Sequence, residues 1–319
     1  MKQQHFEARQ RRFWDAMART LDHLEESRPG SPPIAPAEFP AACRRLAHHL
    51  ALARQRGYSL ALTDWLNTLV LRAHRQLHRQ PPPLGDRLRG LLLEEFPRAV
   101  RRQWPWHLAS TLCLVLSGAL LFMLVHTQPE MVFAVLDEQT LYNLEDMYSN
   151  RDDLDRGPGD DLLMFGFYIY NNIGIAFRTF AGGLLLGVGA LFIMVFNGGF
   201  LGAVSAHILH IDAGEAFFTF VIAHGAPELV AICLAGGAGL QLGAALLAPG
   251  QRSRLDALRA AAGRCLPVIA GVVLFLVAAA FIEAFWSPRA FAPEVKYSVG
   301  ALSWLLVAAF LALGGRHAD

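Results

Sequence analysis

Amide and ionisable side chains interrupt the long apolar run from Leu162 to Leu247. A charged side chain at bilayer depth costs about 2.5–3.5 kcal/mol on insertion scales, so such residues usually face a bundle interior or a cavity. A set of this kind could bind protons or cations. We therefore predict a polar intramembrane site formed by Asn171, Asn172, Arg178, Asn197, His224 and Glu228.

These residues also have structural interpretations, which stay open at this point. Membrane asparagines commonly hydrogen-bond between helices, and Arg178 could extend its guanidinium to the headgroups. Glu228 would lie in the first turn of a helix, where the macrodipole favours an anion. A metal site that adds His207 and His210 is a further alternative. Zinc hydrolases need two His on one helix face, whereas HGAPE has one, so we expect no metal, cofactor or catalytic residue.

Two groups of helix-breaking residues divide this part of the chain. The segment Leu184–Leu209 would be about 39 Å long as a helix, against a hydrocarbon core of about 30 Å. We therefore predict one break at Gly198 and Gly199 and another at Gly225 and Pro227, because Pro suits the first turn of a helix. The residues between them would form a re-entrant or interfacial hairpin, and such broken helices mark the substrate site in transporters.

The apolar segments predict an all-α, polytopic helical bundle in the membrane, because hydrophobic residues make up 54% of the chain. About six spans, some of them broken or re-entrant, are expected within residues 104–319. The apolar lengths place them at Trp106–Val125, Leu163–Phe180, Leu184–Leu209, Ala226–Leu247, Leu266–Phe285 and Val299–Leu313. Small-xxx-small glycine pairs allow close helix approach and favour a homo-oligomer; these include Gly183 with Gly187 and Gly239 with Gly243.

Charge asymmetry predicts the orientation of the bundle. Residues 1–103 hold 18 Lys and Arg against 10 Asp and Glu, whereas residues 127–161 hold 2 against 10. Loop 249–264 adds four Arg, and cytoplasmic loops collect such residues. We therefore expect a multi-pass membrane protein, with both termini cytoplasmic and an acidic outer loop at 127–161.

Residues 1–103 are predicted to form a basic, helical cytoplasmic domain. Apolar residues recur at helical spacing in 6–26, and two further helices are expected at Ala41–Arg56 and Leu60–His78, with a last one at Leu84–Arg102. Anionic lipid headgroups explain the basic charge more simply than nucleic acid does, so no nucleic acid is expected as a partner. The four cysteines have no CxxC spacing, which argues against a disulfide framework or zinc knuckle.

Several segments resemble hallmark sequences of the stage II sporulation protein M family. They are YIYNNIGIAFRTFAGGLLLGVG at 168–189, FNGGFLGA at 196–203 and HGAPELVAICLAGGAGLQLG at 224–243. LNTLVLRAHRQLHR at 66–79 and FPRAVRRQW at 96–104 are similar to the cytoplasmic region of its Gram-negative, non-sporulation members. The sporulation member is implied to work with peptidoglycan-degrading partners in wall remodelling.

From this resemblance we expect a non-enzymatic membrane scaffold, or complex component, linked to remodelling of the cell envelope and peptidoglycan. Its partners would be the lipid bilayer, other membrane or envelope proteins, and further copies of itself. The alternative is a transporter or channel for a small solute or ion, which would use the polar site at the broken helices.

Overall fold

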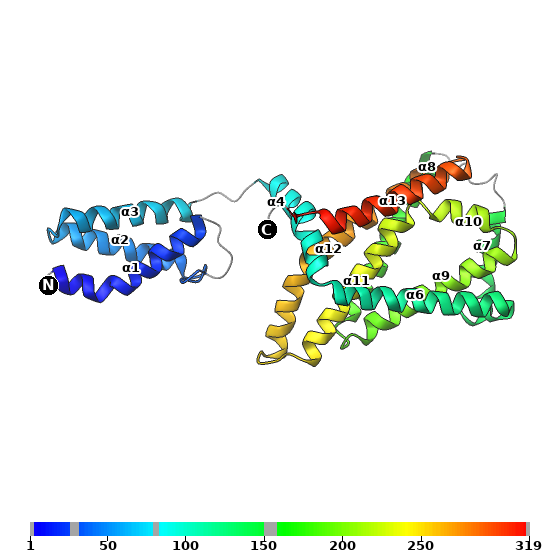
Figure 1. The fold of residues 1–319 in the computed structure, drawn as a ribbon, viewed down its shortest axis with the longest axis horizontal. Helices are drawn as coiled ribbons and strands as arrows, with labels where there is room; N and C mark the ends of the chain where they lie inside the picture. The colour runs from blue at the N-terminus through cyan, green and yellow to red at the C-terminus, as the bar shows by residue number, and fades with distance from the viewer. Residues whose placement is uncertain (1–2, 26–31, 79–82, 150–157, 317–319) are drawn as a thin grey trace. The chain divides into compact units, whose positions relative to one another are not determined.

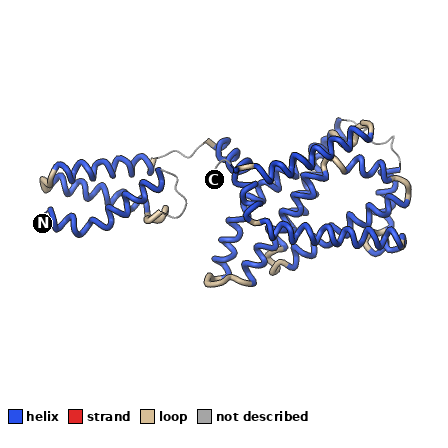
Figure 2. Tube along the Cα trace, in the orientation of Figure 1, coloured by secondary structure: helices blue, strands red, loops and turns tan. Residues whose placement is uncertain are grey.

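The computed structural model describes residues 3–25, 32–78, 83–149 and 158–316. The described residues form helices and connecting turns, with no strand among them (Figures 1 and 2). The chain divides into two compact units, Met1–Pro83 and Leu84–Asp319. The predicted all-α class is confirmed.

The first unit is a three-helix domain with its own core, made of α1 (Gln3–Glu25), α2 (Phe39–Gln55) and α3 (Leu60–Leu77). The apolar faces predicted from helical spacing meet in its centre, and the fully buried side chains include Trp14, Met17, Leu21, Leu46 and Leu66. The Trp14 indole N–H donates to Nδ1 of His49 over 3.1 Å within this core. On the surface, Arg72 binds the carboxylates of Asp22 and Glu25, which joins α3 to α1.

The second unit holds the apolar helices. In chain order its elements are α4 (Leu84–Gly90), the π-helical turn η1 (Leu91–Glu95), α5 (Phe96–Arg102), α6 (Trp104–Thr127), the 3-10 turn η2 (Pro129–Ala134), α7 (Glu138–Ser149), α8 (Pro158–Gly182), α9 (Val188–His210), α10 (Gly214–Val221), α11 (Gly225–Leu247), α12 (Arg254–Phe285) and α13 (Pro293–Leu313). Five of these, α6, α9, α11, α12 and α13, are long and apolar enough to cross a membrane. The sixth predicted span corresponds to α8, where Asn171, Asn172 and Arg178 lower the hydropathy.

The unit boundary differs from the predicted one at residue 103. Residues 84–103 belong to the bundle, because Phe96 is fully buried with its ring against Phe275 of α12 and Phe310 of α13. Gln103 adds a polar contact, since its Nε2 donates to the Arg264 carbonyl oxygen over 2.9 Å. The helix expected at Leu84–Arg102 therefore docks onto the membrane helices, and the separate domain ends at Pro83.

The expected helix break at Gly198 and Gly199 is wrong. α9 runs unbroken through both residues and lies beside α6 (Figure 1). The two glycines serve close packing against α6 instead. A Cβ atom on Gly202, one turn further along, would lie only 2.0 Å from the carbonyl oxygen of Gly118. The NGG sequence is therefore a helix-contact surface, because only hydrogen side chains let the two backbones approach this closely.

The break in this region lies earlier, in the turn between α8 and α9. Leu186 and Gly187 have φ angles of 55° and 87°, in the left-handed region that ends a helix. Gly183 and Gly187 of this turn pack on Gly239 and Gly243 of α11, respectively. The small-residue pairs that predicted self-association are thus used for contacts within the chain.

The second predicted break is present. α10 ends at Val221, and α11 begins at Gly225 with Pro227 in its first turn. Pro is tolerated there because the first backbone N–H groups of a helix have no intrahelical acceptor. The hairpin expected between the two breaks is not formed as predicted, because α9 continues to His210 and only the short α10 (Gly214–Val221) lies between α9 and α11. α11 packs against α6, α8, α9, α12 and α13.

Candidate functional site

The break before α11 positions two ionisable side chains inside the bundle. His224 is the residue that precedes α11, and Glu228 follows in its first turn, with its backbone N–H donating to the His224 carbonyl oxygen. The His224 side chain is 4% exposed and that of Glu228 is 19% exposed. A carboxylate at this position benefits from the positive end of the helix dipole.

Both nitrogens of the His224 ring face polar atoms. Nδ1 lies 3.0 Å from the hydroxyl oxygen of Ser287, which follows the end of α12. Nε2 lies 3.9 Å from Oε2 of Glu228. The Phe220 ring, from α10, covers the imidazole edge-on at 5.4 Å between centroids. The ring is therefore held in one orientation, with Nε2 directed toward the carboxylate.

A second carboxylate, Glu283 in the last turn of α12, completes this cluster. One donor atom from each of His224, Glu228 and Glu283 lies within 4.8 Å of the other two. We refer to these three residues as the carboxylate–histidine junction. Lys296 of α13 is buried beside it, and its Nζ donates to the Ser287 backbone oxygen over 2.9 Å. Buried charges are stable only when they are paired, hydrogen-bonded or bound to a metal, so the stability of this group depends on how its charges are balanced.

The predicted asparagines do not join this group through side-chain hydrogen bonds in the described part of the chain. The Asn171 amide donates to the Asn172 oxygen over 2.9 Å, and the Asn197 amide donates to the Ile193 carbonyl of its own helix. Arg178 similarly donates to the Gly174 carbonyl. Of the six predicted residues, the structure brings together His224 and Glu228, whereas the other four bond within their own helices.

Sequence reasoning missed Glu283, Ser287 and Lys296. Glu283 had a detectable signal, because it is a carboxylate within the last turn of an apolar span, in the sequence FIEAFW. Ser287 and Lys296 had no such signal, because both lie between two predicted spans. Polar residues are ordinary in such a connection. Only the antiparallel pairing of α11 and α12 brings position 287 next to position 224.

An ion pair lies near the same end of α12. Asp161, from the first turn of α8, is buried and accepts from the guanidinium of Arg289. Burying such a pair costs desolvation free energy, and removing one partner leaves an uncompensated charge. The pair therefore fixes the start of α8 to the turn that carries Ser287.

His207 and His210, which the alternative of a metal site would add to the polar residues, lie elsewhere in the bundle. His207 in the last turn of α9 places Nε2 2.7 Å from a carboxylate oxygen of Glu145 in α7. The His210 ring stacks on His126 of α6 at 5.3 Å. Neither histidine is among the residues of the carboxylate–histidine junction. His207 thus holds α7 against α9, whereas His210 packs on the last turn of α6.

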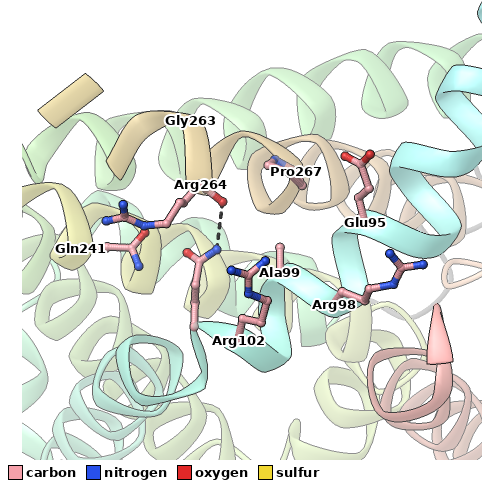
Figure 3. A pocket seen from close by; sticks show the side chains of 9 residues that line it. Glu95, Arg98, Ala99, Arg102, Gln241, Gly263, Arg264 and Pro267 are labelled. Atoms are coloured by element: carbon pink, nitrogen blue, oxygen red, sulfur yellow. Dashed lines mark hydrogen bonds between the residues drawn. The ribbon is translucent and has the colours of Figure 1, made fainter. Parts of the chain in front are cut away.

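A basic cavity of about 370 Å³ lies among η1, α5, the second half of α11 and the first half of α12, away from the junction (Figure 3). Arg98, Arg102 and Arg264 line it together with Glu95 and the amides of Gln103 and Gln241. The Gln103 side-chain amide donates to the Arg264 backbone oxygen and so links the end of α5 to α12 beside the cavity. The cavity agrees with the positive charge of the neighbouring loops and offers no nucleophile or carboxylate pair for catalysis.

Two family models match the chain. Residues 4–79 match a domain of unknown function (DUF8413), which covers the three-helix domain. No curated protein and no solved structure gave a match. The second model, stage II sporulation protein M, matches residues 110–288 and so covers more than half of the chain, including all three residues of the junction. The protein therefore belongs to the stage II sporulation protein M family.

Proposed function

We propose that this protein is a non-enzymatic membrane scaffold in a complex that remodels the cell envelope. The observation that carries the proposal is its construction from two separately packed units, one a helical domain with its own core and the other a membrane bundle of the sporulation family. A scaffold needs one part that stays in the membrane and another that offers a surface to partners.

The packing of the bundle supports a structural role. Gly202 packs on Gly118, and Gly239 packs on Gly183. The backbones approach so closely at both contacts that a Cβ atom on Gly202 or Gly183 would overlap the facing glycine. Such contacts favour a single arrangement of the helices, because moving one helix along another brings a side chain against backbone. A bundle of this kind suits the holding of partners better than large alternating movements.

The proposed setting is a bacterial inner membrane with both termini in the cytoplasm. The charge difference between residues 1–103 and 127–161 supports this orientation. It places the junction at the outer end of the bundle and the basic cavity at the inner end, where anionic headgroups are found. Asn143→Cys, at an exposed position of α7 and with the four natural cysteines replaced, should react with a membrane-impermeant maleimide in intact cells. Labelling only after the inner membrane is opened would show that α7 faces the cytoplasm, which is the opposite of the proposed orientation.

The scaffold proposal is tested by isolating the tagged chain from native membranes. The matched control is a chain of residues 84–319, which lacks the three-helix domain but keeps the bundle. Partners that bind the three-helix domain should be recovered with the full chain, in amounts comparable to that of the chain itself. The same partners should be lost with the control. Recovery of the chain alone in both cases would refute the proposal.

Transport of a small cation or proton is the second candidate, and the buried carboxylate–histidine junction favours it. Ionisable residues at membrane depth mark ion pathways in many transporters, as do helices that begin inside the bundle. Flux in proteoliposomes decides between the candidates. Flux that Glu228→Gln abolishes would support transport, whereas a protein that carries no flux but retains its partners would support the scaffold.

A further inference from the structure

We propose that the carboxylate–histidine junction binds one divalent transition-metal ion, with Zn²⁺ as the probe. The ligands are Nε2 of His224 and one carboxylate oxygen each from Glu228 and Glu283. This inference goes beyond the scaffold function and does not rest on it. A metal held here would join the first turn of α11 to the last turn of α12.

The spacing of the donor atoms fits a metal ion after small side-chain rotations. Zn²⁺ binds His nitrogen and carboxylate oxygen at about 2.0–2.2 Å in a tetrahedral arrangement, so neighbouring ligand atoms lie about 3.3 Å apart. The three donors of the junction already lie within 4.8 Å of one another, and His224 Nε2 is 3.9 Å from the nearer Glu228 oxygen. Carboxylate torsions are soft, which leaves this gap within reach.

The contact of His224 with Ser287 resembles the support that metal-ligating histidines receive. Such a histidine usually donates its other ring N–H to an oxygen atom, which fixes the tautomer and the orientation of the ring. The Ser287 hydroxyl lies 3.0 Å from Nδ1, so it can accept that N–H and leave the Nε2 lone pair free for a ligand. Ser287 is itself fully buried, and its carbonyl oxygen accepts from Lys296.

Charge also favours a divalent ion. Two carboxylates within a few ångström of each other in a medium of low dielectric constant repel strongly unless a cation lies between them. A divalent cation balances both charges at once. Lys296 is the other positive group beside the junction, and its ammonium group is a competitor for this role.

The donor set selects the class of metal. One imidazole and two carboxylates suit Zn²⁺, Mn²⁺ or Fe²⁺, whereas Mg²⁺ prefers oxygen ligands alone and retains its water. Three protein ligands leave a fourth position for water or for a group from a partner. Glu228 is the least buried of the three side chains. Water or a partner group would therefore reach the fourth coordination position from the side of Glu228.

Binding is measured on the full chain in detergent after treatment with a chelator. Equilibrium dialysis should give about one Zn²⁺ per chain, and Zn²⁺ should raise the unfolding temperature. Glu228→Gln and Glu283→Gln should each lower the affinity at least about tenfold. Glu145→Gln is the matched control, because it removes the carboxylate of the other His–Glu pair and should leave binding unchanged.

A spectroscopic measurement covers the case in which a glutamate variant fails to fold. Co²⁺ added to the wild-type chain should give the visible bands of a four- or five-coordinate nitrogen–oxygen site, and Zn²⁺ should displace them. An absence of stoichiometric binding by the wild-type chain would overturn the proposal. Binding that appears only in Lys296→Met would also overturn it, since Lys296 would then be the resident cation. Neither result depends on the recovery of partners, so failure here leaves the scaffold proposal intact.

Discussion

His224 and Ser287 lie 63 positions apart in the sequence, and a 3.0 Å contact between Nδ1 and Oγ joins them inside the bundle. The contact connects the residue before α11 to the turn after α12. It fixes the imidazole whose Nε2 faces Glu228.

Ser287→Ala should therefore destabilise the bundle. The change leaves a buried ring nitrogen without its hydroxyl partner, which costs roughly 1–3 kcal/mol. We expect a lower unfolding temperature in detergent, measured by circular dichroism. Ser298→Ala is the control, because that hydroxyl is exposed and bonds only to its own helix. Equal unfolding temperatures for the two variants would contradict a structural role for the His224 contact.

Glu228 should tolerate loss of its charge better than loss of its polarity. In the presence of a chelator, Glu228→Gln keeps the shape and a hydrogen-bonding group and should change stability by less than about 1 kcal/mol. Glu228→Leu leaves His224 facing an apolar side chain and should lower both the unfolding temperature and the yield of folded protein. A leucine variant as stable as the glutamine variant would show that the junction does not stabilise the bundle.

Gly202→Ala should disrupt the packing of α6 on α9. The new Cβ atom would meet a backbone oxygen of Gly118 at 2.0 Å, so a helix must move, at a cost of about 1–3 kcal/mol or more. Gly166→Ala in α8 is the matched control, since its Cβ atom meets nothing within 4 Å. The control should be neutral or slightly stabilising, because Ala favours helix. The comparison uses unfolding temperatures, and a neutral Gly202→Ala would argue against the close contact.

The three-helix domain should lose stability in mild acid. Burial lowers the pKa of His49 to about 4, and its Nδ1 must stay unprotonated to accept from Trp14. The unfolded chain takes up a proton near the ordinary pKa of 6.5, whereas the folded domain does so only near 4. Stability therefore falls as the pH drops from about 6.5 to 4, by about 2 kcal/mol.

Urea unfolding of residues 1–83, followed by tryptophan fluorescence, tests this pH dependence. His49→Gln should flatten the slope between pH 6.5 and 4.5, because glutamine does not titrate. His48→Gln, at the exposed neighbouring position, should keep the slope of the natural sequence. A slope that is the same in all three proteins would exclude His49 as its source.

Local pattern predicted the helices well, because apolar spacing and apolar length reflect burial within one element. The spans and the break at Pro227 follow from such local rules. Gly198 and Gly199 misled the prediction because glycine lowers helix propensity and also permits close packing, and only the position of α6 shows which effect applies. Ser287 and Lys296 were not predictable for the same reason, since their role arises from contacts between helices distant in sequence.

The most direct test of the scaffold account compares partner recovery by the natural chain and by Glu228→Gln, both isolated from native membranes in a chelator-containing buffer. The account predicts that each recovers the same envelope proteins in the same amounts, because partner binding requires the folded units and not the charge of Glu228. Loss of these partners by a folded Glu228→Gln chain would contradict it, as would a natural chain that recovers no partner at all.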